Sequence, residues 1–267
     1  MTSHEPRSTA TPERFQRPSV FTWVVLVGFL AFLIQGLSTI DTTFERLLQG
    51  MGNLGDFFAR AVPPDFSRFD SIAGAMLETL NMAVVGVTAG VILSVPMALL
   101  CSRNTTPHWS IAWISRGVVA TLRTVPELVW ALIFVAAVGL GPLAGILAIV
   151  MDTIGFAARF FSERIEEIPK GPSEALASTG ASRTGTIIGA ILPEASASMT
   201  ATSLYSIEKG IRSAIVLGLV GAGGIGVELS TAMSMFNYDA ALAIIIVILL
   251  VVIGVEQVSS AIRQRLL

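Results

Sequence analysis

Long apolar runs alternate with short polar segments along most of this chain. A helix rises about 1.5 Å per residue, so roughly 20 apolar residues cross the hydrocarbon core of a bilayer. Six runs of about that length or longer are predicted to be membrane-spanning helices: 20–37, 72–100, 114–138, 143–161, 186–207 and 240–262. The pattern therefore predicts an all-α membrane protein with about six crossings and both termini on one side.

The segment between the first two runs, 41–71, is too polar to cross. It carries charges of both signs and Pro63-Pro64, and predicts a loop with one interfacial helix at about 44–58. The first run is longer than the core of a secretory signal peptide, and no small-x-small cleavage site follows it. We therefore expect a retained span, with residues 1–19 as an N-terminal tail and 20–267 as the transmembrane domain.

Basic residues predict the orientation, because cytoplasmic loops carry an excess of Lys and Arg. With six spans, one face holds the basic residues of both ends and of the segments after spans two and four: Arg7, Arg14, Arg17, Arg103, Arg116, Arg164, Lys170, Arg183, Arg263 and Arg265. The opposite face holds fewer, with acidic neighbours: Arg46, Arg60, Arg68, Lys209 and Arg212. Both termini are therefore expected in the cytoplasm.

The amino-acid composition excludes several classes of protein. Of 267 residues, 53% are hydrophobic and 13% charged, against about 25% charged in an ordinary globular domain. This excludes a disordered chain and a nucleic-acid binder. The single cysteine, Cys101, excludes a disulfide scaffold, and His4 and His108 are too isolated to bind a metal. No nucleophile and base stand in a catalytic pattern, so neither a metal site nor an enzyme is expected.

The segment 162–183 is the longest polar stretch between spans on the predicted inner face. Ser173 is a good N-cap, Glu174 suits the positive end of a helix, and Gly180 is a natural stop. A short helix and a turn between two membrane helices form a protruding knob. Such a knob is either a passive linker or a docking element.

Here the sequence resembles the permease subunits of ABC importers. Their cytoplasmic loop carries an E-A-A pattern, three further residues, a glycine, nine further residues and then I-x-L-P. This chain has Glu174-Ala175-Leu176, then Gly180, then 190–193 as A-I-L-P, so the third alanine and the isoleucine differ while the spacing is kept. The resemblance implies a type I importer bundle with a coupling helix, in which these residues contact an ATPase subunit: Glu174, Ala175, Leu176, Gly180, Ala181, Ser182, Leu192 and Pro193.

The resemblance also implies the partners. No G-x-x-x-x-G-K-[ST] loop occurs, because the only lysines are Lys170 and Lys209 and neither follows such a loop. ATP and Mg²⁺ are therefore expected on separate ATPase subunits, with no cofactor on this chain. A substrate-binding protein would deliver the ligand, and a second copy of this permease or a related one would complete the pathway in the lipid of a bacterial inner membrane.

Three further stretches resemble the phosphonate and phosphite branch: R-T-V-P-E-L-V-W at 123–130, E-E-I-P-K-G at 166–171 and G-L-V-G-A-G-G-I-G at 218–226. They imply import of a small oxyanion such as phosphonate, phosphite or hypophosphite. Betaine and methionine permeases share a similar glycine run, so these ligands stay as alternatives. So does a secondary transporter or channel that needs no ATPase.

The glycine run suggests irregular backbone inside the membrane. The segment 211–225 spans about 22 Å even as a helix, which is too short to cross. We expect it to enter and turn back among other helices, where irregular backbone is tolerated. The turn at Gly221, Gly223, Gly224 and Gly226 is then either a gate or a packed turn.

Two other features within the spans allow functional and structural readings. Arg123 and Glu127 stand four apart and can pair across a kink at Pro126, as a gating bend or a self-neutralising pair. In the fifth span, Pro193 is expected to break the first turns. Hydroxyl groups follow it and either line the path or satisfy backbone carbonyls, with the path candidates at Ser198 and Thr202 among Ser196, Thr200 and Ser203.

Overall fold

The computed structural model describes residues 19–39 and 44–266, and every regular element in these ranges is a helix. The chain divides into two compact units, one ending at Asp56 and the other beginning at Phe57. The predicted tail, with Arg7, Arg14 and Arg17, lies outside the described residues except for Ser19.

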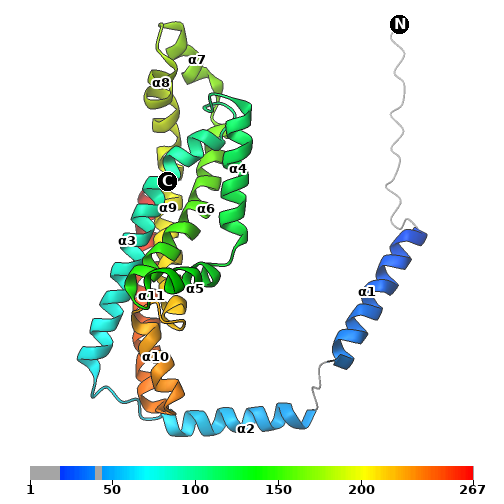
Figure 1. The fold of residues 1–267 in the computed structure, drawn as a ribbon, viewed down its shortest axis with the longest axis vertical. Coiled ribbons are helices and arrows are strands. Elements are labelled where there is room, and N and C mark those ends of the chain that lie inside the picture. The colour runs from blue at the N-terminus through cyan, green and yellow to red at the C-terminus, as the bar shows by residue number, and fades with distance from the viewer. Residues whose placement is uncertain (1–18, 40–43, 267) are drawn as a thin grey trace, which may run out of the picture. The chain divides into compact units, whose positions relative to one another are not determined.

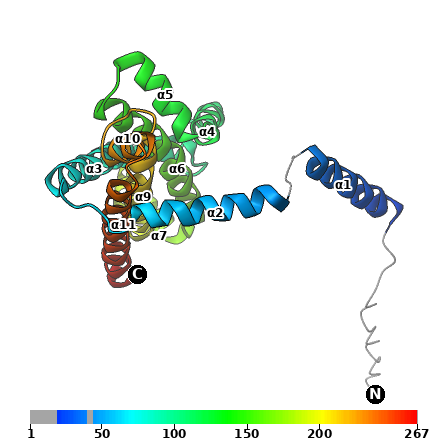
Figure 2. The ribbon, with the colours of Figure 1, turned by 90° about the horizontal axis from the view of Figure 1, so that it is seen from below.

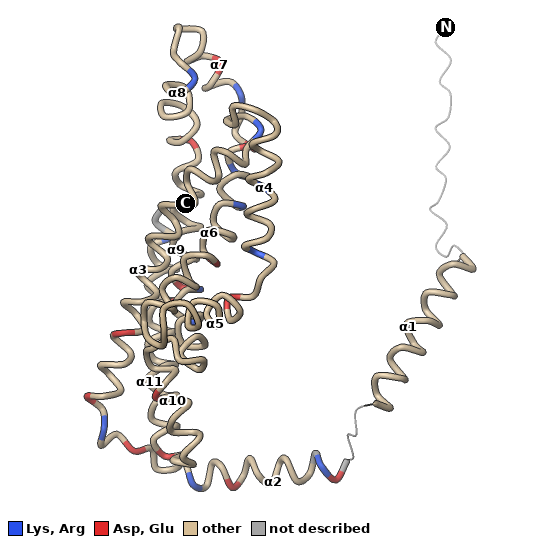
Figure 3. The backbone as a smooth tube through the Cα atoms, viewed as in Figure 1, with Lys and Arg blue, Asp and Glu red and all other residues tan. Residues whose placement is uncertain are grey.

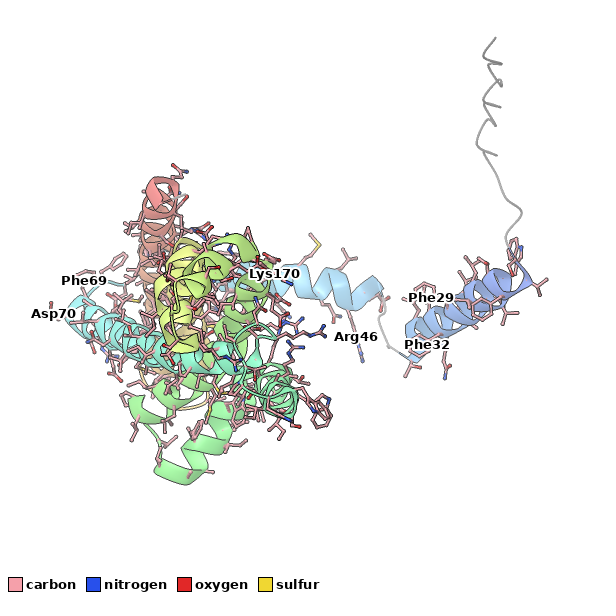
Figure 4. All side chains as sticks on the ribbon, turned by 90° about the horizontal axis from the view of Figure 1, so that it is seen from above. Phe29, Phe32, Arg46, Phe69, Asp70 and Lys170 are labelled. Carbon is pink, nitrogen blue, oxygen red and sulfur yellow. The ribbon has the colours of Figure 1, made fainter. Side chains whose placement is uncertain are left out.

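The first unit holds α1 (Val20–Thr39) and most of α2 (Phe44–Ala61). α1 buries none of its side chains, and Phe29 and Phe32 extend freely from it (Figure 4). A fully exposed apolar helix is what lipid would cover. α2 confirms a helix at the predicted interfacial segment, with the acidic Glu45 in its first turn and the basic Arg60 in its last. Its position at a membrane surface stays a prediction.

The second unit is built around three long helices, α3 (Phe69–Cys101), α6 (Pro142–Glu167) and α9 (Leu192–Gly218). Figures 1 and 2 show α6 and α9 in the middle of this unit. Gly86 and Gly90 of α3 face Ile149 and Thr153 of α6, and a Cβ at Gly90 would lie only 2.5 Å from Cβ of Thr153. Small residues thus let the two backbones approach closely, as in other membrane helix pairs.

The other helices of the unit pack around this centre: α4 (Trp109–Thr124), α5 (Glu127–Val138), α7 (Lys170–Ser178), α8 (Arg183–Thr186), η1 (Ile187–Ile191), α10 (Ile225–Ser234) and the long α11 (Tyr238–Leu266). At one end, the loop before α3 meets the start of α11, where the Asp65 amide donates to the Asp239 carbonyl oxygen at 3.2 Å. The amide and hydroxyl groups of Ser67 donate to the Asp65 carboxylate and lower the pKa of Asp65.

The span prediction needs two corrections. Among the described residues, α1, α3, α6 and α11 are long and apolar enough to cross, and the α4–α5 pair adds a fifth if it counts as one span. The predicted third span is not one helix, because α4 and α5 meet at an angle of 90°. Val125 is extended there and Pro126 lacks an N–H, so the helix cannot continue.

The second correction concerns the fifth span, which the sequence placed at 186–207. α9 instead runs from Leu192 to Gly218, with 27 residues. It is long enough to cross, at about 40 Å, but its charged and hydroxyl side chains make it less apolar than α1, α3, α6 and α11. Residues 211–218 are therefore the last turns of α9 and not a separate segment that enters the membrane.

The predicted reversal at the glycine run is confirmed. After Gly218 the chain turns through Gly221, Gly223 and Gly224, whose φ angles are +85°, +89° and +72°, and α10 follows. Only glycine adopts such angles without strain. Gly226 serves close packing, since a Cβ there would lie 2.1 Å from the Ile215 carbonyl oxygen.

Candidate functional site

The predicted knob is present as α7, although it begins earlier than expected. Pro169 precedes the first helical residue, and Ser173 is inside the helix, where its hydroxyl donates to the Lys170 carbonyl oxygen at 2.7 Å. The Ser173 cap is therefore wrong. Pro172 lies in the first turn, where its missing N–H has no partner to lose. Gly180 confirms the predicted stop, because its φ is +84°.

The knob emerges from two helical rods (Figure 1). The first six residues of the predicted loop, 162–167, are the last turns of α6, so the loop is shorter than expected. On the other side, α8, η1 and α9 follow one another without a break. Pro193 lies in the first turn of α9 after one π-helical turn, so it does not break the rod. α7 contacts this rod through Leu176, which faces Gly189 of η1.

The residues predicted to contact an ATPase divide by exposure. Glu174, Ala175 and Gly180 are exposed, whereas Leu176 and Ala181 are half-buried. Leu176 faces η1, where a Cβ on Gly189 would lie 3.0 Å from its Cδ2. The side chain of Ser182 accepts a hydrogen bond from the Gly185 amide at 3.2 Å and so caps α8. Leu192 is half-buried and Pro193 exposed at the start of α9.

The loop after α3 holds the base of the knob, a contact that the sequence analysis missed. The Arg183 guanidinium donates to the carbonyl oxygens of Thr105, at 3.0 Å, and Thr106. The Asn104 amide donates to the Ile165 carbonyl oxygen at 2.7 Å. These are contacts of side chains with backbone carbonyls, which leave no signal in the spacing of residue types.

The predicted pair of Arg123 and Glu127 does not form. The bend at Pro126 separates the two side chains onto different helices. The Glu127 carboxylate instead accepts a hydrogen bond from the Ser213 hydroxyl at 2.5 Å, which joins α5 to α9. The i, i+4 rule fails here because it applies only within one continuous helix.

Arg123 instead lines a cavity of about 320 Å³ between α4, α6 and the end of α3, which we call the arginine cavity. Its charged residues are Arg116, Arg123, Arg159, Glu163 and Glu166. Arg116 pairs with Glu166 and Arg159 pairs with Glu163, each at 2.5 Å. In Figure 3, basic positions follow α4 toward the α7 end of the unit.

Charges in α9 are also paired, which corrects their assignment to an outer loop. Lys209 Nζ lies 2.7 Å and 2.9 Å from the carboxylate oxygens of Asp152 on α6, and 5.1 Å from the centre of the Phe156 ring. Glu208 is buried and lies between Arg212, at 2.9 Å, and Arg263 of α11, at 3.4 Å. Pairing offsets the cost of placing charge at membrane depth.

The glycine turn is docked on α3. The Gly224 amide donates to the Glu78 carboxylate at 3.1 Å, and the Ile225 amide donates to the Thr79 hydroxyl at 2.8 Å. These groups satisfy the free amides at the start of α10, and the negative charge of Glu78 suits a helix N-terminus. The isolated acidic residue in an apolar run was the available signal for this contact.

The hydroxyl groups of α9 mostly satisfy backbone. Thr202 donates to the Ser198 carbonyl oxygen at 2.9 Å, and Ser196, Thr200 and Ser203 make equivalent bonds within the helix. Ser198 and Thr202 are half-buried. Their position on the same face as Lys209 follows from the helical repeat.

Comparison with known proteins gives the family. Residues 86–267 match the model for "Binding-protein-dependent transport system inner membrane component". The phosphate-import permease PhnE of Mycolicibacterium smegmatis is 38% identical over 95% of this chain, which spans only 46% of that relative. The phosphite permease PtxC of Stutzerimonas stutzeri is 36% identical over 90% of this chain and 87% of its own.

Solved structures agree on the fold. A chain of the inward-facing MetNI methionine ABC transporter superposes with a TM-score of 0.65 over 73% of this chain and 96% of its own, at 19% identity. The predicted importer-type helical bundle is thereby confirmed, and the relatives are permeases rather than enzymes. The chain therefore belongs to the family of inner membrane components of binding-protein-dependent transport systems, as a permease subunit of an ABC importer.

Proposed function

We propose that this permease carries a small phosphorus oxyanion, of the phosphonate, phosphite, hypophosphite or phosphate type, into the cytoplasm. The observation that supports it is the alignment of at least 90% of the chain with relatives named as phosphate and phosphite permeases. The methionine transporter shares the fold at 19% identity, so it offers no support for methionine as the ligand.

The proposed assembly follows the family. ATPase subunits and a binding protein work with permeases of this kind. We propose that ATP and Mg²⁺ bind to the ATPase alone, and that α7 is seated on it through Glu174, Ala175, Gly180 and Ser182. Since an ATPase pair offers two clefts and the chain has one knob, two copies of this permease would form the pathway. From the positive-inside rule, we propose that the knob and both termini lie in the cytoplasm.

Coupling would use the continuous rod from α8 to α9. Movement of α7 on ATP binding shifts α9, whose Ser213 holds Glu127 on the far side of the Pro126 bend. The bend and the glycine turn at Gly221, Gly223, Gly224 and Gly226 are the elements proposed to change between inward-open and outward-open states. Ser198, Thr202 and Arg123 are the remaining proposed path residues.

Reconstitution tests this function. Proteoliposomes holding the permease, its ATPase and its binding protein should take up phosphite or a phosphonate with ATP, and should take up neither betaine nor methionine. Uptake that persists without the ATPase would contradict the mechanism. Separately, Glu174→Lys should abolish copurification with the ATPase, while Asp70→Lys, an exposed substitution at the start of α3 and at the opposite end of the unit, should retain it.

A further inference from the structure

The arginine cavity holds more positive charge than its own carboxylates neutralise. Three guanidinium groups and two carboxylates line it, which leaves one net positive charge. Arg116 and Arg159 each have a carboxylate partner at 2.5 Å. The guanidinium of Arg123 makes no hydrogen bond or ion pair with any residue in the described ranges, and Arg123 is exposed at the cavity wall.

An unpaired guanidinium on a membrane helix calls for an anion. Charge at membrane depth is unfavourable unless a partner, a cavity or an interface compensates it. The carbonyl groups at the C-terminal end of α4, where Arg123 stands, supply only part of this compensation. A planar guanidinium matches the paired oxygen atoms of a tetrahedral oxyanion, with two parallel hydrogen bonds.

We infer that the arginine cavity is a binding site for the transported oxyanion beside the second half of α6, with Arg123 as its main ligand. This inference rests on the proposed function. The volume of about 320 Å³ suits a small ligand. Glu163 and Glu166 hold the other two arginines, so they limit the positive charge offered to the anion. Binding is therefore weak, as a transit site requires.

The position of Arg123 links this site to the bend. Gly155 of α6 fixes the end of α4, since a Cβ there would lie 2.8 Å from the Arg123 backbone nitrogen. Arg123 stands two residues before Val125, where α4 ends, and Glu127 beyond the bend is held by Ser213 of α9. A shift of α9 is therefore transmitted through Glu127 to the bend next to Arg123, whose own backbone stays packed on α6.

The test measures binding of phosphite to the permease–ATPase complex in lipid nanodiscs without the binding protein, by phosphorus NMR titration. Wild type should bind. Arg123→Gln should weaken binding at least tenfold, and Arg123→Lys, which keeps the charge, should weaken it less. Arg103→Gln is the matched control, because Arg103 is an exposed arginine that does not line the cavity and contacts Glu166 only through its backbone amide, which glutamine keeps. It should leave binding unchanged.

Equal binding by Arg123→Gln and wild type overturns the site, as does an equal loss in Arg103→Gln. If the Arg123→Gln variant fails to assemble, a protection experiment on the wild-type protein tests the site instead. Bound phosphite should slow the modification of Arg123 by phenylglyoxal and leave the modification of Arg103 unchanged. Absence of this protection overturns the site.

Uptake assays separate the two proposals, because uptake of phosphite without binding at Arg123 refutes the site alone. Binding at Arg123 without uptake of any phosphorus oxyanion refutes the proposed function alone.

Discussion

Gly90 shows how one residue sets the spacing of two central helices. An added Cβ would lie 2.5 Å and 2.8 Å from the Thr153 side chain and 3.2 Å from the Val150 carbonyl oxygen. The backbone of α6 cannot yield locally, because Thr153 is buried. Gly90→Ala should therefore lower stability by about 1–3 kcal/mol, the usual cost of overpacking.

Thermal unfolding of the purified permease in detergent would measure this change as a lower Tm. Gly74→Ala on the same helix is the control, since nothing lies within 4 Å of its Cβ position. Alanine there should be neutral or slightly stabilising, because it favours the helix over glycine. An equal Tm for both variants would show that α3 and α6 are not tightly packed at Gly90.

The pair of Asp152 and Lys209 allows a second prediction at the residue scale. The side chains are 21% and 32% exposed, so loss of one partner should cost less than the 3–5 kcal/mol typical of a fully buried pair, about 1–2 kcal/mol. Asp152→Asn and Lys209→Met should each lower the Tm. The double variant should recover part of the loss, because no unpaired charge remains. Additive losses would refute a direct interaction.

Helices as elements were largely predictable, whereas their breaks and junctions were not. Apolar runs placed α1, α3, α6 and α11, because a membrane span needs length and little else. The 90° bend was visible only as Pro126, since its angle depends on contacts with α9 such as that of Glu127 with Ser213. The extent of α9 was missed because partners from α6 and α11 compensate its charges, and a sequence does not show which helices become neighbours.

The candidate site likewise has one part that the sequence predicted and another part that it did not. The end of α7 followed from a local rule, because a glycine with positive φ is a common helix stop, whereas the start did not, since Ser173 lies inside the helix. The arginine cavity could not be predicted from local rules. Arg116 and Arg159 come from different helices and line one cavity only because α4 packs on α6. Local spacing even suggested the wrong partner for Arg123.

α7 carries the prediction at the element scale. Gly180 has a φ of +84°, a conformation that costs other L-residues about 1–2 kcal/mol. Gly180→Ala should shift the end of α7 and reduce stimulation of ATP hydrolysis by loaded binding protein severalfold, with the basal rate of the free ATPase unchanged. Gly171→Ala, in the same helix without positive φ or a neighbour within 4 Å, should keep the stimulation. Equal stimulation in both variants would exclude a role for the α7 terminus.

At the scale of the whole molecule, orientation in the membrane remains to be tested. Within the second unit, α7 and the start of α3 lie at opposite ends (Figure 1). α3 alone has 33 residues, or about 50 Å, which exceeds the roughly 30 Å hydrocarbon core. Residues near these two ends must therefore reach opposite sides if α3 spans. The positive-inside rule places the α7 end in the cytoplasm.

Cysteine labelling tests this orientation. Cys101 is buried and is the only cysteine, so Cys101→Ala gives a background in which Ser71→Cys and Ser178→Cys each carry a single exposed thiol. A membrane-impermeant maleimide should label position 71 in intact spheroplasts, and position 178 only after permeabilisation. The opposite result would show that the molecule has the opposite orientation in the membrane, with α7 on the outer side and beyond the reach of a cytoplasmic ATPase. Labelling of both positions in intact spheroplasts would mean that α3 does not cross the membrane, which would also contradict the six-crossing arrangement from which both termini were placed inside.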